Sequence, residues 1–291
     1  RGLSMNHDFL NLLQEKTPGF SKGQRLIANY IITSYDKAAF MTASKLGKTT
    51  NVSESTVVRF AMELGYDGYP SMQRALQDMI RNKFTSVQRM EVANDRIAGQ
   101  DVLSLVMHTD MEHIRTTLEE IDRGVFRAVV DAILGARRVY ILGIRSSSTI
   151  AAFLNYYLGL MMDDVQLVSA SSTSEVFEQI VRVGQGDLLI GVSFPRYSSR
   201  TVKAMRYAHD QGCTVAALTD SLDSPIAACA DYTLLAKSDM VSLVDTLVAP
   251  LSVVNALLVA VGQRREKELA NTFMNLERIW DEYEVYEKID D

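Results

Sequence analysis

Three adjacent serines follow an arginine where an apolar strand passes into an apolar helix. Residues 139–158 read VYILGIRSSSTIAAFLNYYL, so β-favouring side chains give way to a polar turn and then to a long hydrophobic run. A helix begins with unpaired N–H groups and a partial positive charge, which attract phosphates and carboxylates. A helix cap needs one hydroxyl, whereas this turn offers three beside the guanidinium of Arg145. We therefore predict that the turn binds an anionic group.

Two more polar turns follow apolar strands farther along the chain. They read SASSTSE after the strand expected at 165–169 and SFPRYSSRT after the one at 188–193. Since the carboxyl ends of parallel strands meet at one edge of a sheet, we expect the three turns to form a single site. The predicted ligand contacts are Arg145, Ser146, Ser147, Ser148, Ser169, Ser171, Glu175, Ser193, Arg196, Tyr197 and Ser198. Arg200 either adds another guanidinium or forms an ordinary surface ion pair.

Strands alternate with helices through the second half of the chain, which is typical of a parallel sheet with helices on both faces. The predicted strands are Val139–Gly143, Val165–Ser169, Leu188–Ser193, Thr214–Thr219 and Tyr232–Leu235. The helices expected after the first four are Ser148–Met161, Thr173–Val181, Ser199–Gln211 and Ser224–Cys229, and Val241–Tyr286 is expected to be helical. The predicted fold is an all-α bundle followed by a doubly wound five-stranded α/β domain of flavodoxin type.

The first third of the chain is basic, whereas the rest is acidic. Residues 1–90 carry 12 Lys and Arg against 7 Asp and Glu, and the remainder carries 18 against 29, so the 291-residue chain has a net charge of −6. This asymmetry favours an N-terminal domain that binds a polyanion.

A helix-turn-helix pattern lies within this basic part. In SESTVVRFAMEL, Val57, Phe60, Ala61 and Leu64 recur at core-facing spacing, with Ser53 as the expected cap. A helix capped by Thr42 precedes it, and the chain is expected to turn at 47–51. Ser21 is the expected cap of an earlier helix, and Gly65 is expected to end the helix after the turn. In helix-turn-helix proteins the second helix enters the major groove, while an ordinary bundle with a solvated face is the alternative. The predicted DNA contacts are Lys45, Lys48, Thr50, Ser53, Glu54, Ser55, Thr56 and Arg59.

Both halves resemble one family. Residues 22–80, above all ASKLGKTTNVSESTVVRFAMELGYDGYPSMQ, resemble the N-terminal domain of the RpiR family of bacterial transcription regulators. The second half is similar to the sugar isomerase (SIS) domain of that family, in the motifs Gly143-x-x-x-Ser147-x-x-x-Ala151, Ser193-Phe194 before Thr201, and Leu218-Thr219-Asp220-Ser221 with Ser224-Pro225. The resemblance implies a regulator whose SIS domain binds a phosphorylated sugar through Ser147, Ser193 and Ser198.

The chain departs from the usual SIS pattern at three arginines. Arg145 stands where many SIS domains have a glycine, and in the turn after the third strand Arg196 replaces a glycine and Arg200 a glutamate. The added charge suits a more anionic ligand, such as a sugar-acid phosphate, or a carboxylate metabolite without phosphate. Since arginine binds phosphate and carboxylate alike, residue type leaves both open.

A sugar-phosphate isomerase or lyase is the alternative function. Such chemistry requires a carboxylate or imidazole that moves a proton. Only Glu175 lies near a predicted site turn, where it more simply complements the helix dipole or contacts a ligand hydroxyl, and His209 is expected in the body of a helix. The histidines and cysteines show no metal-ligand spacing. We predict a sensor without catalytic residues, metal or cofactor.

The expected organisation is a helix-turn-helix domain at 5–83, a linker and connecting helix at 84–122, and the SIS domain with C-terminal helices at 123–291. A palindromic DNA operator implies a homodimer or tetramer. Two seams with apolar residues 4 and 3 apart, Met107–Ile121 and Leu269–Tyr283, are the candidate interface helices, although the first could pack on its own second domain. The run Leu247–Gly262 is too short and interrupted to span a membrane, and the start lacks a secretory pattern, so we expect a cytoplasmic protein.

Overall fold

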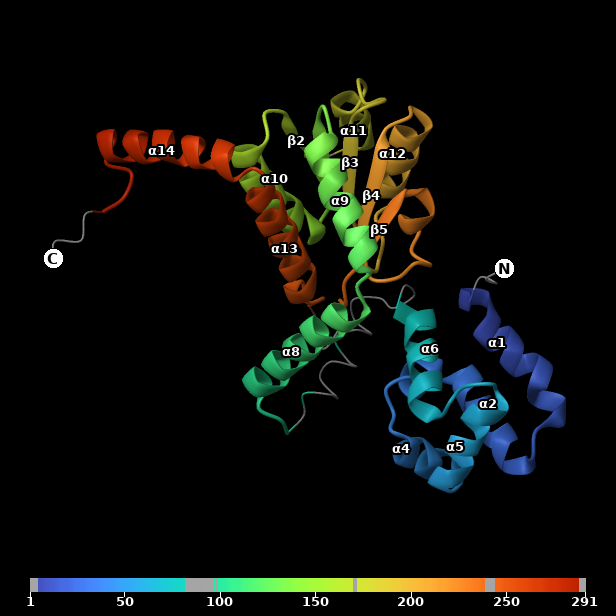
Figure 1. The fold of residues 1–291 in the computed structure, drawn as a ribbon. Helices are drawn as coiled ribbons and strands as arrows, with labels where there is room; N and C mark the ends of the chain where they lie inside the picture. The colour runs from blue at the N-terminus through green and yellow to red at the C-terminus, as the bar shows by residue number, and fades with distance from the viewer. Residues whose placement is uncertain are drawn as a thin grey trace. The chain divides into compact units, whose positions relative to one another are not determined.

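The computed structural model describes residues 5–81, 90, 97, 99–169, 172–238 and 244–287. The chain divides into two compact units, residues 1–101 and 102–291 (Figure 1). Helix α8 (Val102–Glu120), predicted as a connecting helix, contacts α13 (Val248–Arg264) and is part of the second unit.

The first unit is a helical bundle. Its elements are α1 (Met5–Lys16), the 3-10 turn η1 (Thr17–Gly19), α2 (Lys22–Thr33), α3 (Tyr35–Ala38), α4 (Ala43–Thr50), α5 (Glu54–Glu63) and α6 (Tyr69–Arg81). The predicted stripe of α5 is buried, and the ring centroid of Phe60 lies 5.2 Å from that of Phe20. The core therefore fixes which face of α5 is turned to solvent.

The predicted caps of this unit are confirmed. The hydroxyls of Ser21, Thr42 and Ser53 accept hydrogen bonds from the backbone N–H groups three residues later, at 3.3, 3.1 and 3.2 Å. Gly65 ends α5 with a positive φ of 96°, as the pattern predicted.

The turn between α4 and α5 begins later than predicted. Residues 47–50 continue α4, and the chain reverses at Asn51, whose φ is 55°. The backbone N–H of Val52 donates to the carbonyl of Gly47 at 2.9 Å, which closes the turn. A Cβ atom on Gly47 would lie only 2.9 Å from the carbonyl oxygen of Val52, so the two helices require glycine here.

The second unit is built on a five-stranded parallel sheet. The strands are β1 (Val139–Gly143), β2 (Val165–Val168), β3 (Leu188–Val192), β4 (Thr214–Thr219) and β5 (Tyr232–Leu235), in the order β2-β1-β3-β4-β5. This order reverses between β1 and β3, so the predicted doubly wound fold of flavodoxin type is confirmed.

Helices cover both faces of the sheet (Figure 1). One apolar core lies under α9 (Arg123–Gly135), α10 (Ser147–Met161) and α13. The other lies under α11 (Thr173–Gln179) and α12 (Ser199–Asp210). Successive side chains of β1 and β3 enter these two cores alternately, which explains why both strands are apolar throughout.

Two expected helical stretches differ most from the structure. The run predicted at 224–229 contains only a 3-10 turn, η2 (Ala227–Cys229), and the C-terminal part comprises α13 and α14 (Glu266–Glu282), with residues 244–247 outside any helix. Helix α14 extends away from the sheet (Figure 1), and none of its residues is buried. Among the described helices none is long and apolar enough to cross a bilayer.

Candidate functional site

The first polar turn joins β1 to α10 at the carboxyl edge of the sheet. Gly143 brings strand and helix together: a Cβ there would lie 2.4 Å from the carbonyl oxygen of Ser147. Arg145 follows in the left-handed region with φ 61°, and its carbonyl accepts from the Ser148 hydroxyl at 2.6 Å. Ser147 is 5% exposed, whereas Arg145 and Ser146 are exposed. The turn therefore presents a guanidinium beside the start of a long helix.

The third polar turn, between β3 and α12, lies next to the first. Gly143 pairs with Val192 in the sheet, so the two turns leave neighbouring strands, as predicted. The buried Ser193 hydroxyl accepts from the N–H of Ser198 at 3.1 Å, and Ser198 caps α12. Arg196, between them, is exposed. Both turns thus place an arginine and serines before a helix N-terminus.

The fourth turn, after β4, adds a residue that was not predicted. Asp220 accepts hydrogen bonds from the hydroxyls of Tyr197, at 2.9 Å, and of Thr219, at 3.3 Å. This carboxylate ties the β4 edge to the β3–α12 turn. Every strand of a parallel sheet ends at the same edge, so that rule applied to LTDS would have identified Asp220.

Thr201 is a second residue that was not predicted as a contact. In the first turn of α12 it is fully buried, and its hydroxyl has no hydrogen-bond partner among the described residues. Buried hydroxyl groups are normally paired.

The second polar turn is only partly described, and Ser171 lies outside the described residues. The backbone of Ser169 is hydrogen-bonded to the side chain of Gln179. The Ser169 carbonyl accepts from the Gln179 amide nitrogen at 2.7 Å, and the Ser169 N–H donates to the Gln179 amide oxygen at 3.1 Å. Ser172 caps α11 by accepting from the N–H of Glu175, which stands in the first turn of that helix. Glu175 thus complements the helix start, as one interpretation predicted.

The predicted DNA contacts lie on α4, the turn and the start of α5, and most of them are exposed. The exposed members are Lys45, Lys48, Ser53, Glu54, Ser55 and Arg59, and Thr56 is half-buried. Thr50 is not part of this surface: it is 7% exposed, and its hydroxyl donates to the carbonyl of Leu46 at 2.8 Å. The prediction for Thr50 was wrong because that residue belongs to the last turn of α4 and faces the core.

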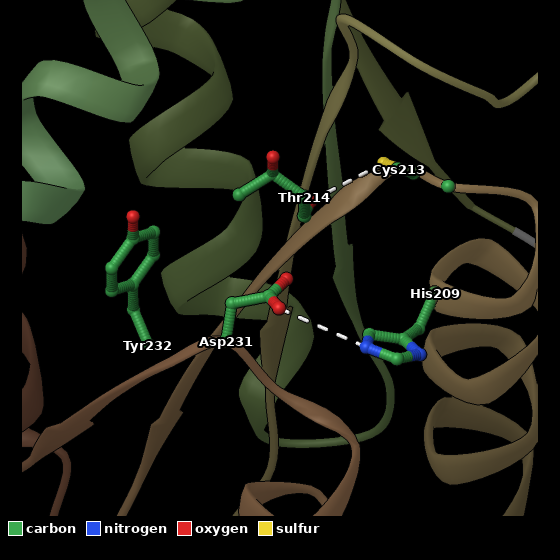
Figure 2. Close-up of a pocket in the computed structure, with 6 residues that line it drawn as sticks. His209, Cys213, Thr214, Asp231 and Tyr232 are labelled. Carbon is green, nitrogen blue, oxygen red and sulfur yellow. Dashed lines mark hydrogen bonds and ion pairs between the residues drawn. The ribbon is translucent and has the colours of Figure 1, made fainter.

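A separate hollow of about 300 Å³ opens at the opposite, amino edge of the sheet (Figure 2). There His209 Nε2 lies 3.7 Å from Asp231 Oδ1. His209 is in the last turn of α12, not in the helix body as expected, and 11 residues of helix place it roughly 16 Å from Ser198. Burial raises the pKa of the Cys213 thiol in this hollow to about 12, so it stays protonated at neutral pH. These groups are remote from the polar turns.

Two domain families match the chain. The helix-turn-helix domain of the rpiR family matches residues 7–83, and the SIS domain matches residues 132–260. The two matches fall in the two units of the structure.

Similar proteins cover one or both halves. An uncharacterised HTH-type transcriptional regulator of Haemophilus influenzae is 26% identical over 93% of this chain and 95% of its own length. The sugar isomerase domain of an RpiR transcription factor from Sphaerobacter thermophilus is 29% identical, with a TM-score of 0.59 over 62% of this chain and 99% of that one. The Vibrio vulnificus NanR protein, complexed with ManNAc-6P, shares the fold at 22% identity, with a TM-score of 0.58 over 94% of this chain and 98% of its own.

Proposed function

The chain is a transcriptional regulator of the RpiR family, with an N-terminal helix-turn-helix domain and a C-terminal SIS domain, and we propose that an anionic metabolite bound at the carboxyl edge of its sheet controls its binding to DNA. The observation that carries this proposal is the pairing of Gly143 with Val192, which sets the turns of Arg145 and Arg196 side by side. A regulator acts where the DNA is, so we place it in the cytoplasm.

The class of ligand follows from the groups in these turns. Two guanidinium groups and two helix N-termini favour a phosphate or carboxylate, while serine hydroxyls suit neutral sugar oxygens. The complex of the similar protein NanR with ManNAc-6P is in keeping with a phosphorylated sugar. We propose a sugar phosphate or a related anionic metabolite.

Arg145 gives this proposal a conformational argument. Its φ of 61° lies in a region that costs a non-glycine residue ~1–2 kcal/mol and glycine almost nothing. We take an arginine in this position as support for a functional role of its side chain.

Arg145→Gly is therefore expected to stabilise the second unit by up to ~1 kcal/mol while weakening anion binding at least ~10-fold, because strain is relieved and a charged donor is lost. Urea unfolding and ligand titration on the same samples measure the two effects. Gly19→Ala, at a site with no atom within 4 Å of the added Cβ, is a control in the other unit. A loss of stability without any loss of ligand affinity would assign Arg145 a purely structural role.

An effector screen tests the proposal itself. Sugar phosphates, sugar acids and dicarboxylates are added singly, and the melting temperature is followed, since a ligand at 100 times its Kd stabilises by ~2.7 kcal/mol. Compounds that raise it are then tested for an effect on DNA binding. If none of these anions raises the melting temperature, the proposed ligand class is wrong.

We propose that the SIS domain is a sensor and not an enzyme. Asp220 already accepts hydrogen bonds from two hydroxyl groups, and Glu175 stands at a helix start. His209, the histidine considered above as a possible proton-transfer group, lies at the opposite, amino edge of the sheet. Purified protein is expected to leave mixtures of aldose and ketose phosphates unchanged, as NMR of the mixtures would show.

We expect two substitutions in the helix-turn-helix unit to weaken DNA binding in different ways. Lys48→Ala should weaken binding to all sequences and reduce the salt slope by ~1, because Lys48 would neutralise one phosphate. Arg59→Ala should cost ~1–3 kcal/mol mainly on the operator, because Arg59 would contact base edges. Binding is measured at several salt concentrations on an operator selected from random duplexes and on non-specific DNA.

Arg74→Ala removes an exposed charge from α6, outside the proposed contacts, and serves as the matched control. If Lys48→Ala, Arg59→Ala and Arg74→Ala all lose the same operator affinity, the loss reflects net charge alone. That result would contradict the assignment of Lys48 and Arg59 as DNA contacts.

A two-fold assembly is also proposed, since one helix-turn-helix reads only a few base pairs. The apolar side chains of the first predicted seam are exposed on α8: Met107, Met111, Ile114 and Leu118 are 37–57% accessible. Of the second seam, Phe273 and Tyr283 are exposed, and no residue of α14 is buried. In the single chain these apolar side chains are exposed to solvent, so they are available to pack against a second copy.

The full chain is expected to be dimeric or tetrameric at micromolar concentration, and Met111→Glu on α8 should raise the dissociation constant at least ~10-fold, because burying a charge is costly. Light scattering measures the mass. The control Glu112→Lys changes the neighbouring exposed residue without touching the apolar stripe. A monomeric wild type, with and without ligand, would refute the assembly.

A further inference from the structure

Helix α8 is oriented with its polar side inward. Asp110, His113 and Thr117 share one face at spacings of 3 and 4 residues, and His113 and Thr117 are each only 6% exposed. The apolar stripe of α8, by contrast, is accessible to solvent, and no α8 residue belongs to the described apolar cores of its unit. An ordinary surface helix shows the reverse pattern. Within its unit, α8 is therefore attached through polar side chains in addition to its contact with α13.

The described partners of Asp110, Thr117 and Glu120 on this face lie between β5 and α13. The backbone N–H of Lys237 donates to the Thr117 hydroxyl oxygen at 2.9 Å, and the ammonium of Lys237 lies 2.6 Å from Glu120. The hydroxyl of Thr246 donates to Asp110 at 2.6 Å. Thus α8 is attached to the segment that leaves the carboxyl end of β5.

The same segment is attached to the proposed ligand edge. The N–H of Ala236 donates to the carbonyl of Thr219 at 2.8 Å, just before Asp220, which accepts from the Tyr197 hydroxyl at 2.9 Å. A continuous hydrogen-bonded connection therefore runs from the turn of Arg196 to Thr117. Its hydrogen bonds are joined by two covalent steps, one between Thr219 and Asp220 and one between Ala236 and Lys237.

We propose that Thr117 is a positioning residue through which ligand binding at the β3–α12 turn is transmitted to α8, an inference that rests on the proposed function. A ligand that displaces Tyr197 and Asp220 changes the end of β4, and the backbone from Ala236 to Lys237 carries the change to Thr117. A helix held by a few hydrogen bonds shifts at lower cost than one packed into a core. Since α8 is the first element of the second unit and follows the helix-turn-helix unit in the chain, a shift of α8 would give the ligand an effect on the DNA-binding unit.

The connection is tested first without ligand, in the full chain. Thr117→Val keeps the side-chain shape and removes the acceptor of the Lys237 N–H, so hydrogen exchange over 236–238 is expected to rise about fivefold. Thr116→Val, on the neighbouring position of α8, is the matched control and should change nothing there. Tyr197→Phe removes the hydrogen bond at the far end and should accelerate exchange over 110–120. If Tyr197→Phe leaves 110–120 unchanged, the connection does not exist.

Inorganic phosphate, the group common to sugar phosphates, then serves as the probe. In wild type it is expected to slow exchange over both 193–200 and 110–120, and in Thr117→Val only over 193–200. Equal slowing over 110–120 in both proteins would overturn the role of Thr117. Absence of any slowing over 193–200 would instead contradict the proposed anion site, and the Tyr197→Phe comparison would still decide whether the connection exists.

Discussion

Gly143→Ala is expected to lower the free energy of unfolding of the second unit by about 3 kcal/mol or more. The added Cβ would lie 2.4 Å from the carbonyl oxygen and 2.8 Å from the carbonyl carbon of Ser147, and 3.0 Å from the Cβ of Ala151. Backbone atoms cannot rotate away, so β1 and α10 must separate. Because Arg145 and the three serines lie between them, ligand binding should fall as well.

The chain contains a matched control on the same helix. Gly159 lies on the exposed side of α10, and a Cβ there would meet no atom within 4 Å. Gly159→Ala is therefore expected to stabilise the unit by ~0.5–1 kcal/mol, as alanine favours helix. Urea unfolding followed by circular dichroism and by the fluorescence of Trp280, the single tryptophan, measures both variants. Equal stability of the two would show that strand and helix can accommodate the added methyl group.

Arg196→Ala is expected to abolish the effect of the metabolite on DNA binding while operator affinity without metabolite stays close to that of wild type. A charged hydrogen bond to an anion contributes ~1.5–3 kcal/mol, so ligand binding should weaken by roughly 10- to 150-fold. The DNA-binding unit is a separate part of the chain and should be unaffected in the absence of ligand. The metabolite found in the screen is titrated into protein bound to operator.

Arg206→Ala provides the control, because Arg206 is an exposed arginine on the same helix, farther from its N-terminus. It should respond to metabolite as wild type does. A full response in Arg196→Ala would make Arg196 a surface residue and would contradict a ligand held between two arginines.

Local sequence patterns predicted the fold well. Strands β1, β4 and β5 begin and end where the pattern placed them, and Ser21, Thr42 and Ser53 cap their helices. These features depend on side-chain periodicity and on hydrogen bonds three residues apart, so they can be inferred from short stretches. The strand order also followed, because a doubly wound sheet with neighbouring first and third strands is a common solution.

The sequence by itself thus determined the two kinds of domain, the family resemblance and the polar edge of the sheet. Only the tertiary structure decided that Thr50 is buried, that Arg145 is left-handed, and that Asp220 reaches Tyr197. It also decided that α8 turns its polar face inward, toward Lys237 and Thr246. Each of these depends on residues 23 to 136 positions apart, or on backbone geometry imposed by packing, which no local pattern encodes.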